Sequence, residues 1–292
     1  MSQPAPMRAS TRLRQLLRQP ELVVAPGCYD AITARMIERA GFPAVYMSGA
    51  AVSASLGYPD YGLVTMSEMV ERAGVIARSV SIPVVSDADT GYGNELNVTR
   101  TVREFEARGV AAIHIEDQVS PKRCGHLDNK ELIGRDAYVS KIRAAVAARQ
   151  DPDFVIIARS DARTVNGFDD AIERVNAALA AGADVAFFES PTSEEELAAI
   201  PRLVKGDCLL NIVQAGKTPL ISFARARELG YRLAIIPSAL MVSTIGAGEA
   251  ALAAIRKTGA VAPAASSLSP REIFRRVGAD DWDAVRAKAE GG

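Results

Sequence analysis

A cysteine stands among basic residues in the segment SPKRCGHLDNK, residues 120–130. Cys124 is one of three cysteines in the chain, His126 is one of two histidines, and Lys122 and Arg123 directly precede the thiol. Neighbouring positive charges stabilise a thiolate, so a thiol in this position could donate a proton and have its remaining charge compensated. The glycine and the charges are incompatible with a buried element, so we expect a loop here. The competing interpretation is a basic surface loop in which the thiol has no role.

Acidic residues recur at the ends of successive apolar runs. Asp87 and Asp89 end the run PVVSDAD, and Glu116 ends a later one. Asp87 and Asp89 share one face of a strand because side chains alternate. Carboxylates crowded on one rim repel each other unless a cation lies among them, and oxygen ligands suit Mg²⁺ or Mn²⁺. We expect direct contact from Asp87, with the other two acting partly through water. Each acid alone could instead be a helix N-cap or half of an ion pair.

Two further polar residues fall at strand ends. Arg159 follows the run FVIIA, and its planar guanidinium matches a carboxylate, which suggests that it binds an anionic substrate. The alternative is a structural ion pair with Asp161 or Glu189. Tyr46 ends another run, and a guanidinium and a metal nearby would lower its pKa enough for it to act as a base. A purely structural tyrosine is equally consistent with the pattern.

Eight apolar runs without clean alternation predict parallel strands that are buried on both faces. They lie near residues 22–26, 44–48, 83–89, 111–117, 154–161, 185–190, 208–213 and 233–238. Helical stretches separate them, and four of these end at glycines suited to a left-handed C-cap: Gly41, Gly109, Gly182 and Gly230. The pattern favours an α/β fold, a (β/α)8 TIM-type barrel, over an open doubly wound sheet. We expect one domain over 1–292, with the barrel at about 20–260 and extra C-terminal helices at about 261–292.

Composition limits the partners. A net charge of −1 gives no electrostatic reason to expect nucleic acid or an anionic membrane. No continuous apolar run approaches the roughly 20 residues of a membrane helix. The first 20 residues are rich in arginine but lack the apolar core of a secretory signal, so we expect a solvated amphipathic helix rather than a transit peptide. Three scattered cysteines form no disulfide framework, which favours a cytoplasmic location.

Taken in order, these residues resemble the isocitrate lyase/phosphoenolpyruvate mutase superfamily, and within it the short-chain lyases typified by 2-methylisocitrate lyase. The matching segments are GCYDAITARM, YMSGAAVSASLGYPDYG, VSDADTGYGN, HIEDQVSPKRCGH, IIARSDA, FFES and NIVQAGKTP. The resemblance implies a Mg²⁺-dependent barrel, usually a homotetramer in which a C-terminal helix is swapped between subunits. Such enzymes act in carboxylic acid metabolism. They cleave a carbon–carbon bond in a 2-hydroxy di- or tricarboxylate, as when 2-methylisocitrate yields pyruvate and succinate.

The resemblance also implies a role for each matching residue. Cys124 would be the catalytic acid on a mobile lid, and Arg159 would hold the substrate. The metal would be bound, directly or through water, by Asp87, Asp89 and Glu116, and Asp60 would lie in a second layer of residues around it. The carboxylate of the keto acid would be held by Ser48, Gly49 and Ala50. The rest of the site would be lined by Gly125, His126, Glu189, Asn211 and Gln214.

The chain departs from the usual pattern of these lyases at three positions. Gln214 and Ala215 stand where glutamate and glycine are common, and Ala50 replaces a usual glycine. Losing a negative charge and adding methyl groups should change which substituents fit. Lyases of 2,3-dimethylmalate or other substituted malates are therefore alternatives, as are oxaloacetate decarboxylases or hydrolases. A barrel that only binds dicarboxylates is an alternative of another class. Phosphonate-forming mutases fit less well, because the lid carries the lyase pattern KRCGH.

Overall fold

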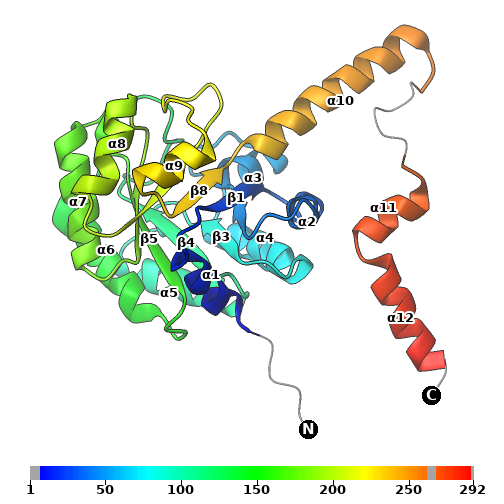
Figure 1. The fold of residues 1–292 in the computed structure, drawn as a ribbon, viewed down its shortest axis with the longest axis horizontal. Helices are drawn as coiled ribbons and strands as arrows, with labels where there is room; N and C mark the ends of the chain where they lie inside the picture. The colour runs from blue at the N-terminus through cyan, green and yellow to red at the C-terminus, as the bar shows by residue number, and fades with distance from the viewer. Residues whose placement is uncertain (1–6, 262–267, 291–292) are drawn as a thin grey trace.

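Eight parallel strands form a closed barrel in the computed structural model, which describes residues 7–261 and 268–290 (Figure 1). The strands are β1 (Val23–Cys28), β2 (Val45–Met47), β3 (Val84–Asp87), β4 (Ala112–Glu116), β5 (Val155–Ser160), β6 (Val185–Phe188), β7 (Asp207–Asn211) and β8 (Leu233–Ile236). Each predicted run overlaps one of them, although β1 extends two residues past its run and β7 begins one residue before its run. The barrel closes where β1 pairs with β8, with Val23 opposite Leu233. The (β/α)8 prediction is confirmed.

Helices alternate with the strands and cover the outside of the barrel. They are α2 (Ala31–Arg39), α3 (Gly49–Ser55), α4 (Met66–Ser79), α5 (Glu95–Ala107), α6 (Arg135–Ala148), α7 (Phe168–Ala180), α8 (Glu194–Leu203) and α9 (Phe223–Leu229), with a 3₁₀ turn η1 (Ala162–Thr164). The four glycines expected to follow helices all have positive φ, from 81° to 103°. The sequence did not predict α3, which begins directly after β2 with Ser48 as its N-cap.

The first helix, α1 (Ala9–Leu17), closes the N-terminal end of the barrel. Its Leu13 and Leu17 are buried against inward-facing side chains of the strands. Its Arg14 lies 2.9 Å from Asp184 and donates a hydrogen bond to the carbonyl oxygen of Phe154. The expectation of a solvated helix is therefore wrong, because the apolar face of α1 covers the open bottom of the barrel.

The C-terminal helices leave the barrel. Figure 1 shows α10 (Ala239–Thr258) starting next to β8 and projecting outward, with α11 (Pro270–Arg276) and α12 (Ala279–Glu290) lying beyond α2. None of the α10 residues is buried, and Leu252 is 68% exposed. By length and composition alone, α10 could cross a membrane. The sequence predicts a long helix here but no continuous apolar run, because small and polar residues interrupt the apolar ones.

Candidate active site

A cavity of about 190 Å³ lies at the C-terminal ends of the strands, where a barrel of this kind carries its chemistry. Most of the predicted site residues line it: Tyr46, Ser48, Ala50, Asp60, Asp87, Cys124, Gly125, His126, Arg159, Glu189 and Asn211. They come from five strand ends and from the loops after α3 and β4. Residues far apart in the sequence therefore meet at one rim, as the barrel prediction required.

Four predicted site residues do not line the cavity. Asp89 and Glu116 are buried. Gly49 packs against Asp87 so closely that a Cβ atom would lie 2.5 Å from Asp87 Oδ2. Gln214 is exposed, whereas its neighbour Val213 lines the cavity. The side chain that faces the substrate space at the end of β7 is thus one residue earlier than we expected.

Lys122 is buried among the acidic residues. Its Nζ lies 2.5 Å from Asp60 Oδ1 and 2.8 Å from Asp89 Oδ1. Arg123 also turns away from the thiol, with its guanidinium 5.6 Å from the centre of the Tyr61 ring. The expectation that both cations flank the thiol is wrong, because buried carboxylates offer the ammonium a stronger partner than a neutral thiol does.

The acidic residues differ in their pKa values. Burial acts to raise the pKa of Asp87, but His114, Lys122 and Arg159 lower it to about 2. Burial raises the pKa of Asp89 to about 6, against the effect of Lys122. Burial also raises the pKa of Glu116 well above its usual value, although Arg159 and Lys122 oppose the rise. A further positive charge among these groups would stabilise their ionised forms.

The acidic residues fit a divalent cation. Neither oxygen of Glu116 accepts a hydrogen bond, although Arg159 Nη1 lies 3.1 Å from Oε2. Within residues 7–261 and 268–290, no three acidic, histidine or cysteine side chains form a ready cluster of ligands. Mg²⁺ needs fewer, since it commonly takes one or two carboxylates together with water and substrate oxygens. Asp87, ionised and lining the cavity, is the residue best suited to direct contact.

His114 is a site residue that we did not predict. Its Nε2 lies 2.8 Å from Tyr46 Oη and 3.5 Å from Asp87 Oδ1. Burial lowers the pKa of His114 to about 4, so the ring is neutral at neutral pH. A histidine within an apolar run gave little signal, but its spacing of two from Glu116 places both on the inward face of β4.

Tyr46 does not have the lowered pKa that its interpretation as a base required, one of the two interpretations that the sequence left open. Burial, followed by the charge of Asp87, raises the pKa of Tyr46 well above its ordinary value of 10.0. The positive charges of Arg159 and Lys122 act in the opposite direction but are outweighed. Without the charge of a metal ion beside it, Tyr46 is therefore a protonated hydrogen-bonding group.

Arg159 makes both structural ion pairs that we had considered. Its Nε lies 2.9 Å from Asp161 Oδ2, and its Nη2 lies 3.5 Å from Glu189 Oε2. The guanidinium also lies 5.1 Å from the centre of the Phe187 ring. Arg159 still lines the cavity, so these contacts hold a charged group rigidly at the place where a substrate carboxylate would lie.

The loop that carries Cys124, residues 119–131, forms a lid over the cavity. Gln118 and Leu132 pair across its base, and Val119 N donates a hydrogen bond to Glu131 O at 2.8 Å. Cys124 is partly exposed and lines the cavity. Burial and the charge of Asp60 raise its thiol pKa above the ordinary 9.0. The expected stabilised thiolate is thus absent, but a thiol that stays protonated suits a proton donor.

The lid packs tightly on the barrel. A Cβ atom on Gly125 would lie 2.5 Å from Arg159 Nη2, so only glycine fits there without a shift. His126 accepts a hydrogen bond from the backbone N–H of Lys217 at Nδ1, 3.1 Å away. Its Nε2 lies 3.4 Å from Glu189 Oε1. The structure therefore has the lid closed over the cavity.

Known proteins resemble the chain over most of its length. A family profile described as phosphoenolpyruvate phosphomutase matches residues 13–256. A 2,3-dimethylmalate lyase from Eubacterium barkeri is 51% identical over 234 residues, which cover 80% of this chain and 81% of that protein. A 2-methylisocitrate lyase from Aeropyrum pernix is 45% identical over 272 residues, which cover 93% of this chain and 88% of that protein.

Solved structures of related proteins superpose closely on the chain. Oxaloacetate acetylhydrolase in complex with the inhibitor 3,3-difluorooxalacetate superposes with a TM-score of 0.94 at 38% identity, covering 98% of this chain and 99% of that one. Phosphonopyruvate hydrolase in complex with oxalate and Mg²⁺ superposes with a TM-score of 0.87 at 33% identity, covering 96% of this chain and 99% of that one. The chain belongs to the phosphoenolpyruvate mutase/isocitrate lyase superfamily, and it is a carbon–carbon lyase of this group.

Proposed function

We propose that the chain is a divalent-metal-dependent lyase that cleaves an alkyl-substituted malate, of the 2,3-dimethylmalate type, by a retro-aldol reaction. The substrate hydroxyl gives its proton to water, the bond between C2 and C3 breaks, the hydroxyl carbon becomes the keto carbon of pyruvate, and C3 leaves with the electron pair. Protonation of C3 then gives propanoate. The relative named 2,3-dimethylmalate lyase supports this choice of substrate class.

The apolar wall of the cavity is the observation that carries the proposal. Phe187, Val213, Pro237 and Met241 are among the residues that line the cavity, and these apolar side chains suit methyl groups rather than a third carboxylate. Arg159 and His126 are the basic residues among the described lining, and Arg159 is already paired with several carboxylates. A buried third carboxylate without a cation would be costly. The cavity therefore favours an alkylated dicarboxylate over 2-methylisocitrate.

The metal would be held through Asp87, with Asp89, Glu116 and Asp60 around it. Mg²⁺, or Mn²⁺ in its place, supplies positive charge that makes the substrate hydroxyl easier to deprotonate. In the proposed complex, Arg159 orients a carboxylate of the substrate, and Ser48, Gly49 and Ala50 at the start of α3 hold the carboxylate of the forming keto acid.

The remaining residues protonate the leaving fragment and enclose it in the cavity. Cys124 Sγ–H donates its proton to C3, because burial keeps the thiol protonated at neutral pH. Tyr46 Oη shares a hydrogen bond with Nε2 of the neutral His114, 2.8 Å away. Gly125, His126, Glu189 and Asn211 shape the closed cavity and exclude water from the carbanion.

A panel of acids tests the proposal. Pyruvate release would be measured with Mg²⁺ on 2,3-dimethylmalate, citramalate, 2-methylisocitrate and isocitrate, and oxaloacetate consumption would be followed separately. We expect the highest kcat/KM for an alkylated malate and loss of activity in EDTA. A preference for 2-methylisocitrate would contradict the argument from the apolar wall. A preference for oxaloacetate would favour a hydrolase or decarboxylase, consistent with the similarity to oxaloacetate acetylhydrolase.

We also propose that the enzyme is a cytoplasmic homotetramer in which a C-terminal helix is swapped between subunits. Exposed apolar side chains on the C-terminal helices support this, among them Val242, Ile245, Leu252, Phe274 and Trp282. Packing against another subunit would remove them from water. The near-neutral net charge supports the proposal that neither nucleic acid nor a membrane is a partner.

A further inference from the structure

We infer that Lys130 and Ser190 form a latch that holds the lid closed by binding the backbone carbonyl of Gly125, the residue after Cys124. This inference deepens the proposed lyase function and rests on it, because the latch would set the position of the proton-donating thiol. Neither Lys130 nor Ser190 lines the cavity, so both are positioning residues rather than catalytic ones.

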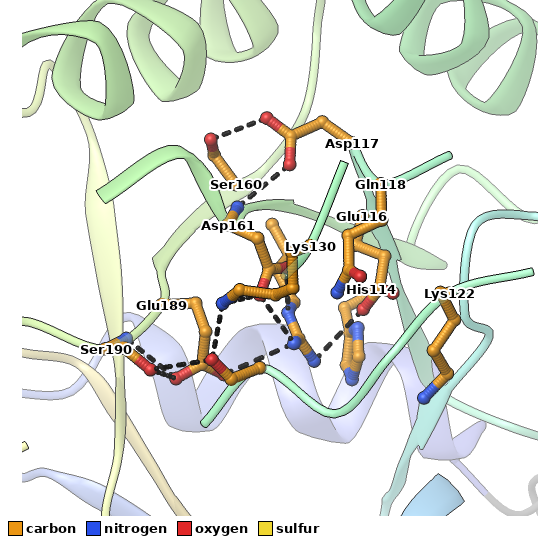
Figure 2. A network of polar contacts seen from close by, with 12 residues as sticks. His114, Glu116, Asp117, Gln118, Lys122, Lys130, Ser160, Asp161, Glu189 and Ser190 are labelled. Atoms are coloured by element: carbon orange, nitrogen blue, oxygen red, sulfur yellow. Dashed lines mark hydrogen bonds and ion pairs between the residues drawn. The ribbon is translucent and has the colours of Figure 1, made fainter. Parts of the chain in front are cut away.

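Lys130 reaches the lid tip from the base of the lid. Its backbone lies next to the pairing of Gln118 with Leu132, which fixes the lid base. Its side chain is buried, and Nζ donates hydrogen bonds to Gly125 O and, at 2.9 Å, to Asp161 Oδ1 (Figure 2). A buried ammonium is costly unless it is fully paired, and one of its two acceptors here belongs to the lid tip. Opening the lid would remove that acceptor.

Ser190 reaches the same carbonyl from the barrel. Its hydroxyl lies 3.2 Å from Gly125 O and 3.0 Å from Glu189 Oε1. The backbone of Ser190 has φ of 56°, in the left-handed region that a serine rarely adopts. Such backbone strain persists where the surrounding structure requires it and often marks a functional site. Here it directs a buried hydroxyl toward the lid.

Asp161 connects the latch to Arg159. The carboxylate of Asp161 accepts hydrogen bonds from Lys130 Nζ, from Arg159 Nε at 2.9 Å and from Arg159 Nη2 at 3.1 Å. The tip of the lid rests on the same guanidinium, because Gly125 has no Cβ atom to hold it away. The group that holds the lid tip and the group that faces the substrate carboxylate are thus fixed by one buried acid.

Lys217 provides a matched control. It also binds the lid, through an ion pair of 2.5 Å between its Nζ and Asp128 Oδ1. The Asp128 side chain is 82% exposed, and exposed ion pairs contribute little to stability. Both lysines therefore contact the lid, but only the buried one is expected to keep it closed.

The test measures how fast iodoacetamide alkylates Cys124 in the presence of Mg²⁺ and oxalate. Cys28 and Cys208 are buried, and a Cys124→Ser protein supplies the background rate. We expect Lys130→Met to raise the rate about tenfold, the effect of losing roughly one charge-assisted hydrogen bond. Ser190→Ala should raise it less, Lys130→Arg should restore most of the protection, and Lys217→Met should leave the rate unchanged.

The pH dependence of alkylation separates lid opening from a changed thiol pKa. For Lys130→Met, the latch predicts that the alkylation rate at high pH reaches a higher plateau than in the wild type. The pH at the midpoint of the rate profile should be unchanged. A shifted midpoint with the wild-type plateau would overturn it, and so would wild-type rates in both Ser190→Ala and a folded Lys130→Met protein. If Lys130→Met does not fold, Ser190→Ala decides the outcome. Alkylation needs no turnover, so faster labelling in a protein inactive on every acid would support the latch while refuting the proposed lyase function.

Discussion

Cys124 is the residue that we propose as the proton donor, and it lies on the lid over the cavity. Its thiol lines the cavity, and burial keeps it protonated, which is the state that a proton donor needs. We expect Cys124→Ser to lower kcat by about two to four orders of magnitude, the usual contribution of a general acid. Steady-state kinetics would measure this, with the melting temperature as the control for folding. Turnover close to that of the wild type would remove the thiol from the mechanism.

The thiol also predicts a pH profile. Because its pKa is raised above 9.0, the thiol keeps its proton as pH rises, and activity is lost only when pH passes through the raised value. We therefore expect kcat to stay level from neutral pH to about pH 9 and to fall above it. A decline centred well below pH 9 that is absent in Cys124→Ser would mean that the thiol is more acidic than its burial implies.

Val213 rather than Gln214 should set substrate preference at the end of β7. Val213 lines the cavity, and Gln214 is exposed. We expect Val213→Ala to change the ratio of kcat/KM between 2,3-dimethylmalate and citramalate by about tenfold, the typical effect of removing a contact with one methyl group. Gln214→Glu is the matched control and should leave the ratio unchanged. The opposite result would restore the role that the sequence suggested for Gln214.

At the scale of elements, the lid can close only because residue 125 is a glycine. A Cβ atom there would lie 2.5 Å from Arg159 Nη2 and 2.7 Å from Glu189 Cγ. We expect Gly125→Ala to lower kcat by at least about 100-fold, since a misplacement near 1 Å can cost that much. Gly134→Ala is the control, because a Cβ atom at Gly134 meets nothing within 4 Å. Equal kinetics in the two variants would show that the lid need not close this tightly.

At the scale of the whole molecule, the C-terminal helices should be covered by other subunits. Trp282 is the only tryptophan in the chain and is 74% exposed in the single subunit. We expect its fluorescence to be blue-shifted in the proposed tetramer and to move to the red when that assembly is diluted into subunits. Light scattering would follow the mass in parallel. A monomer at all concentrations, with the emission of an exposed tryptophan, would contradict the tetramer.

Much of this architecture could be predicted from the chain because it depends on local patterns. Continuous apolar runs specify strands buried on both faces, and the polar residues that end those runs are brought to one rim by any closed parallel barrel. That is why Asp87 and Arg159 could be assigned to a common site from the strand pattern, whereas Cys124 was assigned to it through the family resemblance. The spacing of residues along a strand was also enough to imply that Asp87 and Asp89 share a face.

The partners and ionisation states of these groups depended on the tertiary structure. Whether Lys122 approaches a thiol or a carboxylate, and whether Tyr46 has a lowered or a raised pKa, depends on burial and on charges from distant strands. His114 and Lys130 acquire their roles only from neighbours that the fold supplies. Types and order of residues determined the barrel, the family and the members of the site, whereas distances in three dimensions decided their protonation, because electrostatic energies depend on separation and exposure to water.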